Sequence, residues 1–200
     1  MWLAVWAPLY WRHYGPQNFL WFCDLANIAI GAALWLESPL LFSTQALSVL
    51  VVQTLFTVDF LGRLVGGVHL VGGTEYLFDP SSPLHMRALS LFHVATPPLL
   101  VWALARLGYD RRALALQTAL AWLVLPVSFL AFGPELDLNW VWGPWDRPQR
   151  WMSPWAWFAC CFAGFPLLLY LPTHLLLSRW APVGSPRAPA PRFSDPPARA

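Results

Sequence analysis

The sequence predicts an all-α fold, a polytopic bundle of transmembrane helices. Of the 200 residues 58% are hydrophobic, 16% aromatic and only 11% charged. In a typical soluble domain about a quarter of the residues are charged, so this balance is that of a membrane protein. No segment alternates apolar and polar residues with the period of two that membrane β-strands require, which leaves helices as the spanning elements.

Five apolar stretches are long enough to cross a bilayer. A hydrocarbon core of about 30 Å needs roughly 20 helical residues at 1.5 Å per residue. The stretches lie near residues 19–35, 39–61, 84–104, 112–132 and 154–177. We expect residues 1–180 to form a single transmembrane bundle.

Three of these stretches follow a Ser-Pro pair that predicts a helix start. A Ser hydroxyl can accept hydrogen bonds from the first free N–H groups, and a Pro at the first helical position gives up a donor that has no partner anyway. The pairs are Ser38-Pro39, Ser82-Pro83 and Ser153-Pro154.

The two ends of the chain differ in composition from the spans. Residues 1–14 contain three Trp and two Tyr, which predicts an aromatic helix in the membrane interface, with a sixth partial crossing left open. Residues 181–200 are dominated by Pro, Ala and Arg, and such a segment cannot bury enough apolar area to offset its conformational entropy. We expect this tail to be disordered.

The distribution of Arg predicts an orientation. All twelve basic residues are Arg, and five spans place seven of them on the side of the C-terminus and five on the other side. Lys and Arg favour the cytoplasmic side, so the C-terminus is expected in the cytoplasm. A strongly apolar chain without a signal peptide fits a bacterial inner membrane as the leading option.

Polar residues inside the first two spans indicate buried contacts or a functional site. A charged group near a helix centre costs about 2.5–3.5 kcal/mol on insertion scales, so it needs a partner, a cavity or a task. Asp24 and Asn27 share a face of the first span. The second span carries a polar stripe of four residues, Gln45, Gln53, Asp59 and Arg63. Asp59 and Arg63, four residues apart, are expected to neutralise each other.

The third span carries Ser90, His93 and Thr96 at intervals of three, followed by Pro97-Pro98. Each Pro lacks an N–H and clashes with the carbonyl four residues before it, which predicts a kink. A His near the middle of a span requires cover from protein, water or ligand.

Together these residues predict one polar pocket between the middle of the membrane and the side of the two long loops, which contain Gly72-Gly73 and Asn139-Trp140. The candidate catalytic residues are His93, Asp24 and Asp59, and the other candidate pocket residues are Asn27, Arg63, Ser90 and Thr96. Two simpler interpretations stay open. Asp24 and Asn27 can fasten helices by hydrogen bonds, and His93 can be a satisfied core histidine.

One segment resembles a known family. Tyr14-Gly15 leads into the run Phe19 to Leu25, which ends in Asp24-Leu25, and His93 stands five residues ahead of Pro98. This pattern resembles the androgen-induced family of membrane hydrolases, which cleave fatty-acid esters of hydroxy fatty acids. The resemblance implies a membrane-embedded hydrolase in which His93 assists the nucleophile and Asp24 matches the family's Asp. Trp21 occupies the position of the family's nucleophilic Thr.

These observations leave a small set of functions. The first is a non-catalytic integral membrane protein with a polar intramembrane pocket, associated with lipids or with a membrane-protein partner. The alternative is a lipid-ester hydrolase or acyl-modifying enzyme in which His93 acts as general acid and base with Asp24 or Asp59 as its orienter.

Several cofactor and partner classes are not expected. The three Cys form no metal-binding spacing, and the obvious haem-ligand pair, His93 and His174, differs in membrane depth, so no metal or cofactor is predicted. A net charge of +2 argues against nucleic acid. The chain has no internal repeat of the kind that carriers use.

Overall fold

The computed structural model describes residues 1–144 and 149–181, and these residues form helices without a strand. The predicted disordered tail lies, from residue 182 onward, outside the described residues. The helices are α1 (Trp2–Tyr14), α2 (Phe22–Leu36), α3 (Pro39–Gly66), α4 (Leu84–Leu89), α5 (Phe92–Leu107), α6 (Ala113–Ala131), α7 (Pro154–Gly164) and α8 (Leu171–Trp180). The predicted all-α class is confirmed.

Within the described part of the chain, four helical segments are long and apolar enough to cross a membrane, as in an integral membrane protein. These are Pro39–Gly66, Leu84–Leu107, Ala113–Ala131 and Pro154–Trp180. The first of the five expected spans, near residues 19–35, differs from them. It consists of the five-residue 3-10 helix η1 (Pro16–Leu20) and the 15-residue α2. At 1.5 Å per residue α2 reaches about 22 Å, which is less than a hydrocarbon core of about 30 Å.

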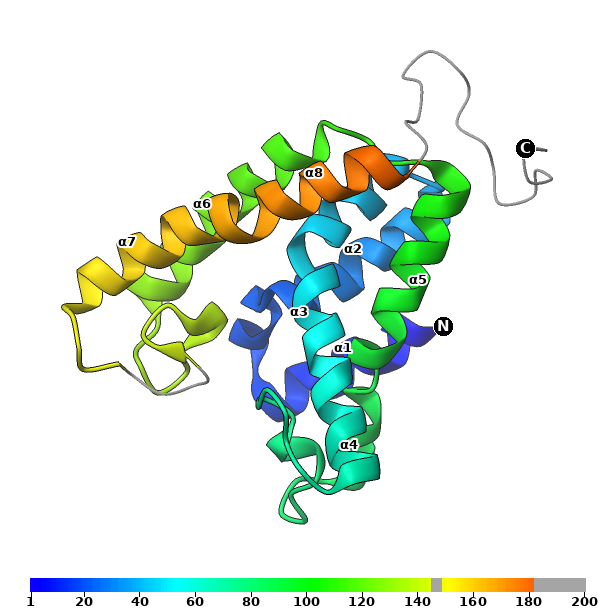
Figure 1. The fold of residues 1–200 in the computed structure, drawn as a ribbon. Helices are drawn as coiled ribbons and strands as arrows, with labels where there is room; N and C mark the ends of the chain where they lie inside the picture. Colours follow the sequence, from blue (N-terminus) through cyan, green and yellow to red (C-terminus); the bar gives the residue numbers. More distant parts are fainter. Residues whose placement is uncertain (145–148, 182–200) are drawn as a thin grey trace.

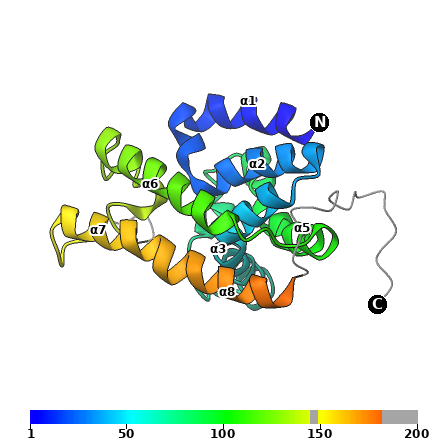
Figure 2. The ribbon, with the colours of Figure 1, turned by 90° about the horizontal axis from the view of Figure 1, so that it is seen from above.

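The long helix α3 is the centre of the bundle. It contacts α2, α5 and α6, and Figures 1 and 2 show these helices arranged around it. Its first half contributes Phe42 and Leu47 to the main apolar core, where Leu100 and Leu104 of α5 and Leu125 of α6 are also fully buried. Helix α6 and the helical stretch of α7 and α8 run antiparallel to each other. Together they diverge from α3 and α5 (Figure 1).

Two of the three predicted helix starts are confirmed. The Ser38 hydroxyl accepts a hydrogen bond from the Leu41 N–H at 3.3 Å, and the Ser153 hydroxyl accepts one from the Ala156 N–H at 3.2 Å. The prediction for Ser82 is wrong, because Pro83 occupies the N-cap position of α4 without a side-chain cap.

The third expected span is interrupted before its prolines. Helix α5 continues through Pro97 and Pro98, and the break falls between α4 and α5 at Ser90 and Leu91. There the His93 N–H bonds to the Ser90 carbonyl and the Val94 N–H to the Leu91 carbonyl, three residues back instead of four. His93 is thus placed in the first turn of α5 instead of mid-helix.

The last expected span is also irregular. A π-helical segment, η5 (Phe165–Tyr170), joins α7 to α8 and begins beside Pro166. Pro166 has no N–H to give to the Phe162 carbonyl four residues before it. The Trp122 indole of α6 donates a hydrogen bond to that carbonyl at 3.2 Å, so a side chain from a neighbouring helix replaces the missing backbone donor.

The aromatic N-terminal segment folds as predicted into a helix, α1, which has 13 residues and is too short for a full crossing. Trp6 is completely buried against Tyr10, Phe19 and Phe92. Figure 2 shows α1 alongside α2 on the outside of the bundle. Its interfacial position stays a prediction.

Candidate functional site

A cavity of about 1,420 Å³ lies between α3 and the segments folded around it. It exceeds the roughly 300–1,000 Å³ of a usual small-molecule pocket. Its wall comes from five parts of the chain: α1 with η1 and the start of α2, one face of α3, the turn into α5, the two long loops, and the π segment. Representative wall residues are Tyr10, Trp21, Val52, Phe56, Gly72, Tyr76, Trp140, Trp151 and Phe165.

Three of the seven candidate residues, Asp24, Ser90 and His93, line this cavity. They come from α2, from the break before α5 and from α5 itself. Asp59, Asn27, Arg63 and Thr96 do not belong to its wall. Both long loops contribute to the wall, one through Gly72, Gly73, Glu75 and Tyr76 and the other through Asn139 and Trp140.

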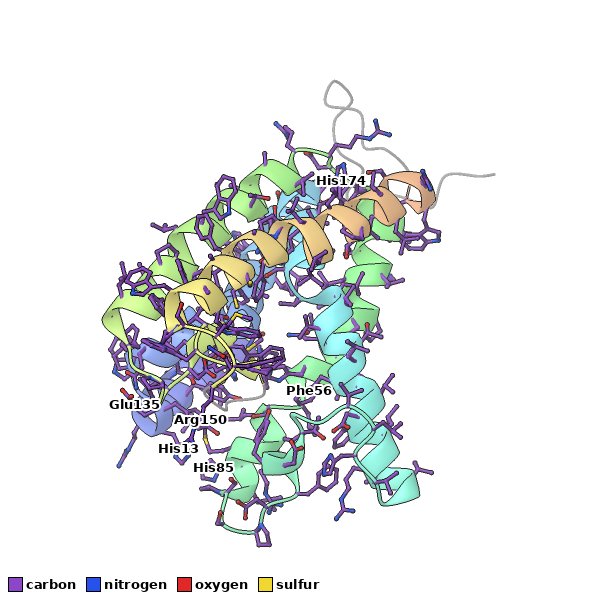
Figure 3. The ribbon with its side chains drawn as sticks, turned by 60° about the vertical axis from the view of Figure 1, so that its left-hand side comes forward. His13, Phe56, His85, Glu135, Arg150 and His174 are labelled. Atoms are coloured by element: carbon purple, nitrogen blue, oxygen red, sulfur yellow. The ribbon has the colours of Figure 1, made fainter. Side chains whose placement is uncertain are left out.

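His93 is held by its backbone turn and by two aromatic rings. Its Nδ1 lies 2.7 Å from the Ser90 carbonyl oxygen, and its ring stacks on Phe56 and Phe92 at centroid distances of 4.6 and 4.0 Å. Figure 3 shows Phe56 on α3. Since a carbonyl can only accept, Nδ1 carries the proton, and Nε2 keeps its lone pair. His93 is therefore a fixed hydrogen-bond acceptor, and a base, on the cavity wall.

Asp24 is 2% exposed and lies in the first turn of α2. Its carboxyl accepts a hydrogen bond from the Asn18 amide and a weak one from the Cys23 thiol at 4.0 Å. In the described part of the chain no hydrogen bond joins Asp24 to His93, so the two groups share a cavity without forming a catalytic pair.

The hydroxyl groups next to His93 on the chain are directed elsewhere. Ser90 donates to the Met86 carbonyl at 3.1 Å, and Tyr10 donates to Ser90 at 2.6 Å. Thr96 donates to the Phe92 carbonyl at 2.8 Å. Neither hydroxyl is therefore presented to the imidazole as an activated nucleophile.

Tyr10 and Tyr76 are uncharged hydroxyl groups on the cavity wall. Burial raises the pKa of both phenols well above the ordinary value, and this effect outweighs the hydrogen bonding with Ser90. Both hydroxyls therefore keep their protons at neutral pH and can donate hydrogen bonds near the Ser90 turn.

Asp59 anchors a loop instead of serving the cavity directly. One carboxylate oxygen accepts the Val71 and Gly72 N–H groups at 2.7 and 2.8 Å. The other accepts the Thr74 hydroxyl and faces the His69 Nδ1 at 2.8 Å. The fully buried carboxylate therefore fixes the segment whose Gly72 and Gly73 line the cavity.

The predicted Asp59–Arg63 pair is wrong. The ion pairs found among the described residues are His69–Asp59 and Arg112–Asp110. Arg63 instead donates to the Gly67 carbonyl just beyond the end of α3. Gly67 has φ +75°, the left-handed conformation that ends a helix, and this turn brings the following loop back to Asp59.

Asn27 fastens α1 to α2. The Trp2 indole donates to its side-chain oxygen at 3.2 Å. This contact matches the simpler interpretation, in which the polar residue joins helices by a hydrogen bond.

Two amides contribute more than the sequence indicated. Asn139 donates to the Leu20 carbonyl and accepts from the Phe22 N–H, both at 2.9 Å, and so bridges the break around Trp21. Gln53 lies on the α3 face that lines the cavity, and its side-chain nitrogen and oxygen have no hydrogen-bond partner among the described residues. The polar stripe of the second span contained Gln53, but nothing local in the sequence links Asn139 to residues 20 and 22.

His174 lies apart from this site. It accepts or donates a hydrogen bond with the Tyr109 hydroxyl at 2.8 Å, and Figure 3 shows it at the opposite end of the molecule from His13 and His85. The described residues contain no cluster of three or more His, Cys, Asp or Glu side chains able to hold a metal ion.

No protein-family model matches the chain, and neither a curated protein nor a solved structure matches it.

Replacing Asp59 by Ala should release the loop from α3. The Val71 and Gly72 amides, which are only partly buried, would lose their acceptor, and a hydrogen bond to a charged group contributes about 1.5–3 kcal/mol. We expect hydrogen exchange at these amides to accelerate by at least about tenfold, which corresponds to about 1.4 kcal/mol. Asp79→Ala, at an exposed carboxylate that bonds Ser81 in its own turn, is the control. Unchanged exchange in Asp59→Ala would show that the carboxylate is not the anchor.

Proposed function

We propose that this chain is an integral membrane protein that binds a lipid-like amphiphile in the cavity beside α3. The observation that carries the proposal is the composition of one continuous wall. Val49, Val52, Phe22 and Phe165 supply apolar surface, and Asp24, His93 and Ser90 supply polar groups. A molecule with an alkyl chain and a small polar group matches both kinds of surface.

The π segment supports access for such a ligand. Gly164 at the end of α7 and Phe165 and Leu169 of the π segment line the cavity, and they belong to a helical stretch long and apolar enough to cross a membrane. Exposed Leu167 and Leu168 follow on the outer side of the same segment. A ligand that dissolves in the bilayer would thus start next to the wall that it must pass.

A second candidate function, a lipid-ester hydrolase, is favoured by the geometry of His93. Its Nδ1 is fixed on the Ser90 carbonyl, which leaves Nε2 as a base in the cavity. In this reaction Nε2 takes a proton from water as the water attacks the ester carbonyl, and the proton passes to the departing alkoxide, which leaves a carboxylic acid and an alcohol. Water replaces a protein nucleophile, consistent with Trp21 at the position where the resembling hydrolases have Thr. Asp24 shares the cavity, and Asp59 has no role in this reaction.

The proposed orientation puts the cavity away from the cytoplasm. The turn between α5 and α6 bonds to α8 through Tyr109 and His174. In the sequence seven Arg residues belong to the segments on this side of the spans and five to those on the other side. The seven are Arg106, Arg111, Arg112, Arg179, Arg187, Arg192 and Arg199. Basic residues near span ends favour the cytoplasmic side, which for the proposed bacterial inner membrane directs both cavity loops to the periplasm.

A bulky residue inside the cavity should abolish ligand binding. In Val52→Trp the indole occupies part of the cavity. We expect the affinity of the detergent-purified protein for a fluorescent single-chain amphiphile to fall at least about tenfold, which corresponds to about 1.4 kcal/mol of binding free energy. Leu55→Trp is the matched control, because Leu55 is on the same helix and 47% exposed. Equal binding by Val52→Trp and the wild type, or no binding above empty micelles, would contradict the proposal.

The hydrolase hypothesis predicts that the wild type cleaves a lipid-like fluorogenic ester. In His93→Ala the rate of cleavage should fall by about 10²–10⁴-fold, the usual contribution of a general base. Expression and monodispersity in detergent should stay unchanged. His85→Ala, at an exposed His of α4, should keep the wild-type rate. If the wild type cleaves no member of a broad panel of esters and acyl compounds, the hydrolase hypothesis is wrong, and only the non-catalytic binding function is left.

Reporter fusions test the orientation. A reporter joined after Ser178 should read cytoplasmic, and one joined after Gly66, at the end of α3, should read periplasmic, because α3 carries the chain across the membrane. The reverse pair of signals would invert the proposed orientation.

A further inference from the structure

We propose that the cavity selects amphiphiles whose polar group is uncharged and carries an N–H or O–H donor, as a fatty primary amide does. This inference names the ligand class of the site and rests on the binding function proposed above. It depends on three groups of the cavity wall, His93, Gln53 and Asp24.

The first group is an acceptor that requires a donor from the ligand. Nδ1 of His93 is engaged with the Ser90 carbonyl, so Nε2 presents a lone pair, and no described residue donates to it. An ester group has only acceptor oxygens and cannot satisfy this nitrogen. A hydroxyl or an amide N–H can.

The second group is the Gln53 amide. The side chain is 1% exposed, and neither its nitrogen nor its oxygen finds a partner within the described residues. Both atoms are covered by the protein in this structure, and buried polar groups are nearly always paired. A ligand that enters the cavity beside Gln53 can supply the missing partner once the side chain turns toward it. A ligand amide presents a carbonyl to the Gln53 N–H₂ and an N–H to the Gln53 oxygen.

Gln53 and His93 belong to the same part of the wall. Gln53 precedes Phe56 by three residues on α3, so their side chains are neighbours on one face of the helix. Phe56 in turn stacks on the His93 ring at 4.6 Å. A small polar group of a ligand placed beside Phe56 therefore lies near both Gln53 and the His93 ring.

The third group adds further acceptors. Asp24 and Glu75 are carboxyl groups on the same cavity wall. Asp24 accepts only the bonds from Asn18 and Cys23 in the described structure, and more lone pairs remain on its oxygens for a donor. A fatty carboxylate brings no donor to these acceptors. The Tyr10 and Tyr76 hydroxyls can donate to the carbonyl oxygen of an amide, an ester or a carboxylate alike, so the acceptors of the wall decide the preference, which is for a neutral donor over both an ester and a carboxylate.

The test compares three ligands with the same alkyl chain: octadecanamide, methyl octadecanoate and octadecanoate. Equilibrium binding is measured by competition with a fluorescent amphiphile, on detergent-purified full-length protein at mildly alkaline pH. We expect the amide to bind at least about tenfold more tightly than the methyl ester and the carboxylate. In Gln53→Leu the preference for the amide over the ester should fall to about twofold or less, with binding of the ester kept.

Two further variants make the result specific. Gln45→Leu is the matched control, because Gln45 is a buried Gln of the same helix that does not line the cavity, and it should keep the wild-type preference. His93→Phe keeps an aromatic ring against Phe56 and removes the Nε2 acceptor, so it should also lose the preference. It provides the test if Gln53→Leu fails to fold.

The outcomes separate this inference from the binding function. Equal affinity of the wild type for the three ligands overturns the inference and leaves lipid binding in place. A wild-type preference that survives in both Gln53→Leu and His93→Phe overturns the assignment to these residues. Absence of binding by all three ligands contradicts the binding function itself.

Discussion

The structure depends on one constraint: polar groups buried inside the protein must find their partners within it. Asp59 would be an unpaired buried carboxylate on the apolar helix α3, and it holds the loop from His69 to Thr74, which supplies two N–H groups and a hydroxyl. Asn139 does the same for the backbone break around Trp21, across more than a hundred residues of sequence. The loops that satisfy these groups become walls, and the cavity lies between them and α3.

The same constraint separates structural polar groups from available ones. Asp59, Asn27 and Thr96 have partners in a loop, an indole and a backbone carbonyl, and none of the three lines the cavity, although the Asn27 side-chain nitrogen also lacks a partner among the described residues. His93 and Gln53 are different, because each belongs to the cavity wall and has hydrogen-bonding capacity that no described residue uses. This difference, together with the apolar surface around the two side chains, indicates a ligand site.

The helical class, the apolar spans and the caps at Ser38 and Ser153 follow from local sequence, because composition and the first turn of a helix are local properties. The interruption at Ser90 and the π segment at Pro166 do not follow from local sequence. A proline only removes a hydrogen-bond donor, and tertiary packing decides where the helix becomes irregular. Asp24, Ser90 and His93 could be grouped by their depth in the spans. The partners of Asp59 could not, because the local candidate, Arg63, is four residues away, and the actual ones come from a loop that turns back at Gly67. The sequence likewise places Asn139 only in a loop, because its partners at residues 20 and 22 are more than a hundred residues away.

A structure determined in lipid nanodiscs would show whether the cavity holds a ligand. We expect an open cavity in which an elongated molecule lies along Val52 and Trp21, with its polar end near His93 and Gln53. The contrary result would be a collapsed bundle in which α3 packs directly on the two loops, with Asp24, Gln53 and His93 each bonded to a different protein neighbour and no space left between them.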